Sequence, residues 1–359
     1  MDKRYLLAFG MGAASLALGI LVVRLVGLGP ALPELPVSPP LPPENVDPPQ
    51  RSQNISGPYK HKNLTVYLVH GKSHRTGKTP LTLEEAMARN VVVVHETSDV
   101  NELHIENVSR TEEVYVQAGD IVKGGKQDRV LTVDLIVPAR SGRLPLDAFC
   151  VEQGRWTARG SESDGRFNSS TEMAPSKELK LAAKHSKSQA RVWETVAEAQ
   201  GGLSAAANTN VASNVSRSSL QLSLENQEVR TSASEYIDAL RSIINGKDDV
   251  IGFVFAINGE INSGDTYGST ELFAKLWPKL LKATAIEAVA ESHHSELSAS
   301  VAAGSMRDFM ATAEKSSIEE DREITPRIKM LTRESEETVL IESQDRESDG
   351  WLHRNYLKR

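Results

Sequence analysis

Residues 250–261 read VIGFVFAINGEI, the strongest hairpin signal in the chain. An apolar run rich in branched and aromatic residues, Val250 to Ile257, leads into Asn258-Gly259. Both residues of that pair tolerate a positive φ, as the tight turn between two antiparallel strands requires. We therefore expect strands before and after the pair to hydrogen-bond to each other.

Helices are predicted on both sides of this hairpin. Residues 176–200 carry apolar side chains at three- and four-residue steps, and Gly201-Gly202 is expected to end that helix. A capping box of Ser232 and Glu235 predicts a second helix. A third begins at Ser269, and its Pro278 is expected to bend or restart it.

Upstream, the chain is β-rich. Short β-branched and apolar runs are separated by turns rich in Asn, Ser, Gly and Pro, which predicts an antiparallel sandwich or barrel-like part. The expected strands cover residues 63–70, 91–96, 103–105, 114–116, 130–137 and 144–151, with one helix inserted at 82–90. The fold class expected is α+β, with this β-rich N-terminal part packed against a helical C-terminal part.

The domain boundaries follow from changes in composition. We expect a membrane anchor or signal at 1–29, a proline-rich stalk at 30–60, an α+β domain at 61–290, and a helix plus charged β extension at 291–359. Within these ranges, residues 203–227 read as a long irregular loop and 296–313 as a helix of small residues. Three short strands are expected in the tail, at 327–331, 338–341 and 351–357.

Composition excludes several classes of function. The 359 residues are 39% hydrophobic and 25% charged, which is typical of a globular protein. A net charge of −7 argues against a general nucleic-acid binder. The single Cys excludes an intrachain disulfide and any thiolate-rich metal site. We expect no nucleic-acid partner, no metal and no cofactor.

The N-terminus predicts a single membrane span. Lys3 and Arg4 precede an apolar run that covers residues 6–28, interrupted only by Arg24. Roughly twenty apolar residues cross a bilayer as a helix, and the preceding positive charges stay on the cytoplasmic side. The rest of the chain is then extracytoplasmic. The alternative is a cleaved signal peptide, which would release a secreted protein.

Two glycine-containing turns are the candidate functional site. The first, Lys123-Gly124-Gly125-Lys126, can present consecutive N–H groups between two ammonium groups, and such nests hold anions. Gln127, Asp128 and Arg129 add an amide, a carboxylate and a guanidinium. The alternative is an ordinary glycine turn with solvated lysines.

The second turn follows a predicted strand on which Ala148, Cys150 and Glu152 share one face. Gly154, Arg155 and Trp156 come next, and an Arg beside a Trp can bind an anion and stack on a ring. The alternative is an Arg–Glu pair with the Trp covering the core. A ligand would meet a cleft only if the two turns come together.

Candidate catalytic residues lie in the same two turns. Glu152 and Asp128 are the plausible acid–base pair, with Asp120 in reserve. Cys150 would serve as a nucleophile if neighbouring cations lowered its pKa, but free Cys is more often buried and structural.

Several of these motifs together resemble the ADP-ribosylglycohydrolase- and rhodanese-phosphatase-associated domain family. The resemblance rests on GDIVKGGKQDR (119–129), CVEQGRW (150–156), Gln189 with Val192-Trp193, and the block from Gly252 to Leu281. It spans about Asn63 to Ala288. The family-like positions are Gly119, Lys123, Gly124, Gln127, Arg129, Cys150, Glu152, Gly154, Arg155, Trp156, Gln189 and Trp193.

The resemblance implies one compact unit and a link to nucleotide-derived ligands such as ADP-ribose. Two hypotheses follow. In the first, a cationic pocket made by Lys123, Gly124, Gly125, Gln127, Arg129, Arg155 and Trp156 binds an anionic ligand. In the second, the same residues are structural and the domain is a non-catalytic envelope module that binds an unknown protein partner. Whether the protein is an enzyme stays open.

Overall fold

The computed structural model describes residues 54–359 except 76, 98, 293–299 and 349. The predicted anchor at 6–28 and most of the proline-rich stalk lie outside the described residues. Within the described part, every helix is too short or too polar to serve as a membrane span. The described residues fall within one compact unit, Arg51–Arg359.

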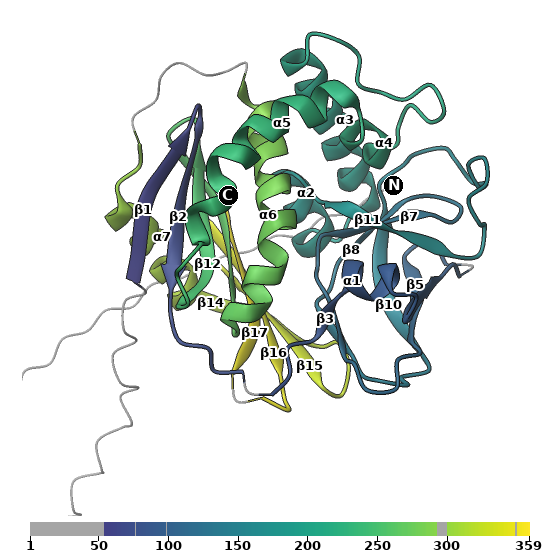
Figure 1. Ribbon diagram of the computed structural model, residues 1–359, viewed down its shortest axis with the longest axis horizontal. Helices are drawn as coiled ribbons and strands as arrows, with labels where there is room; N and C mark the ends of the chain where they lie inside the picture. The colour runs from purple at the N-terminus through teal and green to yellow at the C-terminus, as the bar shows by residue number, and fades with distance from the viewer. Residues whose placement is uncertain (1–53, 76, 98, 293–299, 349) are drawn as a thin grey trace, which may run out of the picture. The chain divides into compact units, whose positions relative to one another are not determined.

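An eight-stranded antiparallel sheet forms one side of this unit (Figure 1). Its order is β1–β2–β12–β13–β17–β16–β15–β14. The strands are β1 Asn54–His61, β2 Leu64–His70, β12 Val250–Ile257, β13 Glu260–Tyr267, β14 Ser317–Glu323, β15 Ile328–Glu334, β16 Thr338–Asp345 and β17 Trp351–Lys358. The predicted hairpin is confirmed: Ile257 pairs with Glu260, and Asn258 and Gly259 have φ of 52° and 81°.

Both faces of the large sheet are covered, so all eight residues of β12 are buried. On one face, Phe253 and Phe255 pack in the main core with α6 (Thr270–Ala290). On the other face, Val254 and Ala256 pack in a second core with α7 (Ala303–Lys315). Two-sided burial explains why this strand reads as a continuous apolar run.

Two smaller sheets form the opposite side. One has the order β11–β7–β8–β10–β5–β4, and the other β3–β6–β9, in which only β3 and β6 run parallel. Their strands are β3 Leu81–Thr82, β4 Val92–His95, β5 Glu102–Asn107, β6 Val114–Val116, β7 Asp120–Gly124, β8 Arg129–Leu131, β9 Leu135–Val137, β10 Arg143–Cys150 and β11 Phe167–Met173. Thr82 and Glu85 form a capping box that starts α1 (Leu83–Ala88).

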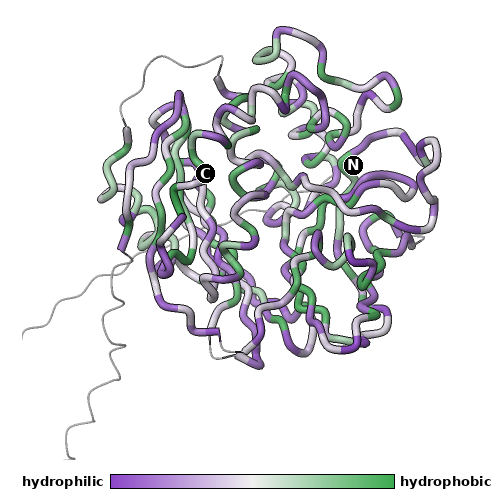
Figure 2. The backbone as a smooth tube through the Cα atoms, viewed as in Figure 1, coloured by the Kyte–Doolittle hydropathy of each residue, from purple (hydrophilic) through white to green (hydrophobic). Residues whose placement is uncertain are grey.

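Helices fill the space between the large sheet and the smaller sheets, with α6 at the centre (Figure 1). The others are α2 Lys177–Lys180, which continues as a π-helical turn at Leu181–His185, α3 Gln189–Ala206, α4 Leu220–Leu224, and α5 Gln227–Leu240, followed by a 3-10 turn at Arg241–Ile244. Both α3 and α5 pack against α6. In Figure 2 the apolar residues gather in the packed interior, while the connecting loops are mostly hydrophilic.

The α+β class is confirmed, but the C-terminal part is not mainly helical. Strands β12 to β17 build most of the large sheet, and the N-terminal β1 and β2 extend it. The charged tail segments therefore continue the same sheet as the hairpin. Strand β14 was missed because its sequence, SIEEDRE, is that of a charged edge strand with no apolar alternation.

Four features of the helices also differ from prediction. Helix α3 runs through Gly201-Gly202 to Ala206, and α5 begins at Gln227 with Asn226 as its cap. Residues 220–224 form α4 within the segment predicted as a loop. Helix α6 passes Pro278 without a break. Helices α3 and α5 both pack against α6, and tertiary packing of this kind overrides local propensity.

Candidate functional site

The two predicted turns lie against each other. The Arg155 guanidinium donates from Nη1 to the Gly125 carbonyl at 3.1 Å and from Nη2 to the Gly124 carbonyl at 3.4 Å. Gly124 and Gly125 have φ of 108° and 54°, which turns these carbonyls toward Arg155 without steric cost. Arg155 therefore binds carbonyl groups of the first turn. The N–H groups of that turn donate to other residues.

Carboxylates of the protein itself occupy those N–H donors. The Gly124 N–H donates to Asp128 Oδ1 at 2.9 Å, and the Lys126 N–H donates to Glu96 Oε2 at 3.1 Å. The carboxylates of Asp128 and Glu96 therefore take the place of the anion that was predicted to bind in this nest.

The guanidinium groups nearby are also paired with acids. Arg155 contacts both oxygens of Glu152 at 2.7 Å, and Arg159 holds both oxygens of Asp128 at 2.6 and 2.8 Å. We call the whole set the arginine–carboxylate cluster; it consists of Arg129, Arg155, Arg159, Glu96, Asp128, Glu152 and Glu162. Three guanidinium groups face four carboxylates, so the cluster has no surplus positive charge.

The pKa values of the two proposed acid–base residues are shifted in opposite directions. Burial raises the pKa of Asp128 despite its Arg159 partner. Burial acts to raise the pKa of Glu152 as well, but the hydrogen bond from Arg155 lowers it overall. Burial also raises the pKa of Cys150, which favours the thiol over a nucleophilic thiolate. Asp120, the reserve, is paired with Lys279 at 2.6 Å.

Two other predicted positions have structural contacts. Gln127 donates to the Glu152 carbonyl at 2.6 Å. The Gln189 amide accepts from the Cys150 N–H at 2.9 Å and donates to the Cys150 carbonyl at 2.8 Å, which fastens β10 to α3. Sequence reasoning missed Arg159, whose place in the loop after the second turn carries no spacing signal.

Only the edge of this region faces solvent. Trp156 is 49% exposed, and Lys126 Nζ lies 5.5 Å from its ring centre. Lys123 is partly buried and contacts Glu225 at 2.7 Å. None of these residues lines any of three well-formed cavities in the described part of the chain. The turns meet as predicted, but they make a packed ionic cluster.

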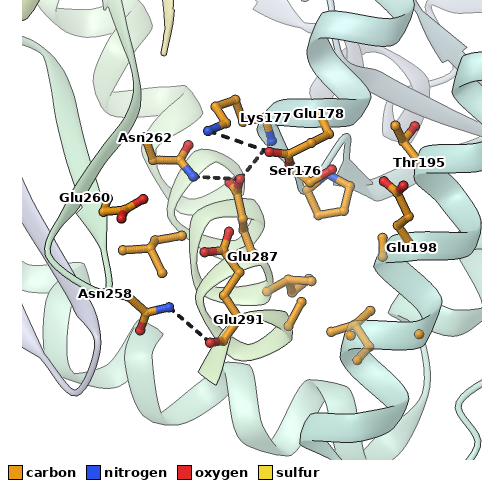
Figure 3. Close-up of a pocket in the computed structure, with 18 of the residues that line it drawn as sticks. Ser176, Lys177, Glu178, Thr195, Glu198, Asn258, Glu260, Asn262, Glu287 and Glu291 are labelled. Carbon is orange, nitrogen blue, oxygen red and sulfur yellow. Dashed lines mark hydrogen bonds and ion pairs between the residues drawn. The ribbon is translucent and has the colours of Figure 1, made fainter. Parts of the chain in front are cut away.

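The largest of these cavities lies elsewhere, between β13, α6 and the segment from α2 to α3 (Figure 3). It measures about 930 Å³, and we call it the Glu287 cavity. Glu287 projects from α6 and Glu291 caps the end of this helix, with Glu260 and Asn262 of β13 on one side and Thr195 and Glu198 of α3 on the other (Figure 3). Its acidic residues are Glu178, Glu198, Glu260, Glu287 and Glu291.

Glu287 is the buried centre of this site, only 2% exposed. Its Oε1 accepts from the Lys177 N–H at 2.8 Å and from Asn262 Nδ2 at 2.9 Å. Its Oε2 accepts no hydrogen bond from any described residue. Burial raises the pKa of Glu287 to about 7. Burial, reinforced by the charge of Glu287, also raises the pKa of Glu291 to about 7.

Sequence reasoning missed this site although a signal exists. Glu287 lies in the run Ala285–Val289, whose other members are small or apolar and are all buried. A charged residue inside a buried helical stretch is rare unless it is paired or functional. The partners from β13 and α2 are far away in sequence, so the cavity itself could not be predicted.

Comparison with known proteins gives one result. The family model of the ARG and Rhodanese-Phosphatase-superfamily-associated Protein domain, ARPP-1, matches residues 52–357. No curated protein and no solved structure matches the chain. The match extends past Ala288 through the last strands of the large sheet. The chain therefore belongs to the ARPP-1 domain family.

Proposed function

We propose that this domain binds a small molecule in the Glu287 cavity. The cavity volume lies in the range of sites for small ligands, about 300–1,000 Å³. The observation that carries the proposal is Glu287, a buried carboxylate with an oxygen that no described residue satisfies. A buried polar group without a partner costs stability, so folds retain one mainly where it serves a function.

Filling the cavity tests this proposal. Ala199 lines the cavity, and Ala197, two residues earlier on α3, is exposed and does not. We expect Ala199→Phe to abolish the thermal stabilisation that a bound compound gives, while Ala197→Phe keeps it. The measurement is a thermal-shift screen of the full chain with a chemically diverse panel of metabolites. Stabilisation that is equal in both variants would place the ligand elsewhere.

A second candidate is an anionic, nucleotide-derived ligand such as ADP-ribose, bound at the outer edge of the two turns. It is supported by Lys126, whose ammonium lies over the exposed Trp156 ring. Stacking on Trp156 and a contact with Lys126 would be its main interactions, because Arg129 and Arg155 are already paired. A shift with ADP-ribose that Lys126→Ala removes, and that exposed Lys315→Ala leaves, would favour this candidate.

The remaining alternative is a protein-interaction module without a small ligand. It would be favoured if no compound in the panel stabilises the wild-type protein while the domain still captures a specific protein partner.

We also propose that residues 6–28 anchor the protein and that the domain is extracytoplasmic. The apolar run after Lys3 and Arg4 supports this topology. Protease added to intact cells should cut within the proline-rich residues 30–49 and release the domain. A domain that resists until the membrane is broken would place it in the cytoplasm.

A further inference from the structure

We propose that the ligand of the Glu287 cavity is an organic cation: a primary ammonium or guanidinium group carried on a short hydrocarbon chain. The inference rests on the proposed function and adds the chemical class of the ligand.

Hydrogen-bonding capacity is the first argument. Three buried side-chain atoms on cavity-lining residues accept no hydrogen bond from any described residue: Glu287 Oε2, Asn262 Oδ1 and Asn258 Oδ1. All three are acceptors once Glu287 has lost its proton. The amide of Asn262 is oriented by its donation to Glu287 Oε1, so its oxygen is the atom left over. A ligand that satisfies this set must bring donors, and ammonium and guanidinium groups carry only donors.

Charge is the second argument. Five glutamates line the cavity, and Lys177 is the one basic side chain among the described residues lining it. Lys177 lies 3.6 Å from Glu178, so one acid already has a counter-charge. Lys180, which is not a lining residue, acts electrostatically on Glu287 and reduces but does not cancel the excess of negative charge. When these glutamates are ionised, the cavity attracts cations, and it repels phosphates and carboxylates.

The apolar residues that line the cavity indicate the chemistry of the uncharged part of the ligand. Apolar side chains also line the cavity, among them Ala199, Leu203, Ile257, Ile261, Ile286 and Ala290. They would cover a hydrocarbon chain. A bare metal ion fits poorly, because no three His, Cys, Asp or Glu side chains among the described residues come close enough to coordinate one. The space of about 930 Å³ suits a molecule.

Matched probes test the inference by calorimetry on the full chain at pH 8, above the pKa of about 7 of Glu287 and Glu291. 1,4-Diaminobutane and agmatine carry the proposed groups, while 1,4-butanediol and succinate have chains of the same length with neutral or anionic ends. We expect at least one cation to bind and neither of the other two to do so. Glu287→Gln should weaken that binding about thirty-fold, since it removes one partner of a buried charge pair. Glu194→Gln, on the exposed face of α3, should leave it unchanged.

The outcomes separate the two proposals. If the cations fail but a neutral or anionic compound binds and Ala199→Phe blocks it, the ligand class is overturned and the binding function stands. If a cation binds equally to wild type and Glu287→Gln, the assignment to this cavity is wrong. If neither these probes nor any panel compound binds, both proposals fall.

Discussion

Because burial raises the pKa of Glu287 to about 7, the folded protein keeps a proton that the unfolded chain loses near its ordinary pKa of 4.5. The stability linked to this proton is complete below pH 4.5 and is lost as pH rises through 7. Glu287→Gln stays neutral, and its amide oxygen can still accept from Lys177 and Asn262. We expect it to be more stable than wild type at pH 8, by up to about 3 kcal/mol, and about equal at pH 4.5.

Urea unfolding at the two pH values measures this difference. A variant that loses stability equally at both would show that Glu287 has an ordinary structural role. A gain in stability together with the loss of ligand binding is the expected signature of a residue kept for function.

Arg155 is the residue on which the two hypotheses for the turns differ most. Glu152 is fully buried, and without Arg155 its remaining guanidinium partner is Arg159 at 3.5 Å. We expect Arg155→Ala to lower the free energy of unfolding by about 3 kcal/mol, as breaking a buried ion pair does. Arg191→Ala, which breaks an exposed pair with Glu194, should cost less than about 0.5 kcal/mol. A stable Arg155→Ala protein that loses a nucleotide-induced thermal shift would restore the cationic-pocket hypothesis.

Between elements, the contact of α3 with α6 forms one wall of the cavity and depends on a single glycine. A Cβ at Gly202 would lie 3.0 Å from the Ala290 carbonyl oxygen, whereas one at Gly201 would meet nothing within 4 Å. Gly201→Ala should stabilise the protein by about 0.5–1 kcal/mol through helix propensity. Gly202→Ala should be at least about 1 kcal/mol less stable than Gly201→Ala, because α3 must move. Equal melting temperatures would mean that the helices are not closely packed there.

Individual strands and helices could be predicted from the sequence more accurately than the way in which they pack together. Val250 to Ile261 carries its own turn chemistry, so the hairpin could be identified locally. Helix α3 was ended too early because Gly202 looks like a terminator, although its role is close contact with Ala290. The meeting of the two turns was foreseen, but the acids that neutralise them include Glu96, from a separate strand connection. The Glu287 cavity needs β13, α2, α3 and α6 together, which no local pattern encodes.

Across the whole domain, a buried ionic network ties the smaller sheets to the large one. His353 on β17 contacts Asp134, which precedes β9, at 2.8 Å and Asp265 on β13 at 3.0 Å. Burial acts to lower the pKa of His353, but the charge of Asp134 raises it overall. The stability this histidine contributes is therefore complete below its ordinary pKa of 6.5 and is lost as pH rises through the higher folded value.

We expect His353→Gln to lower the free energy of unfolding by about 3 kcal/mol at pH 6 and by clearly less at pH 9. Thermal unfolding at both pH values tests this. A cost that does not change with pH would mean that the histidine is neutral in the fold.

We propose that the ligand binds in the Glu287 cavity and not at the two glycine turns. Calorimetric titration of the best-binding compound into wild type, Ala199→Phe and Lys126→Ala distinguishes the two places. We expect binding to be lost in Ala199→Phe and unchanged in Lys126→Ala. Binding that survives in Ala199→Phe and disappears in Lys126→Ala would contradict this proposal.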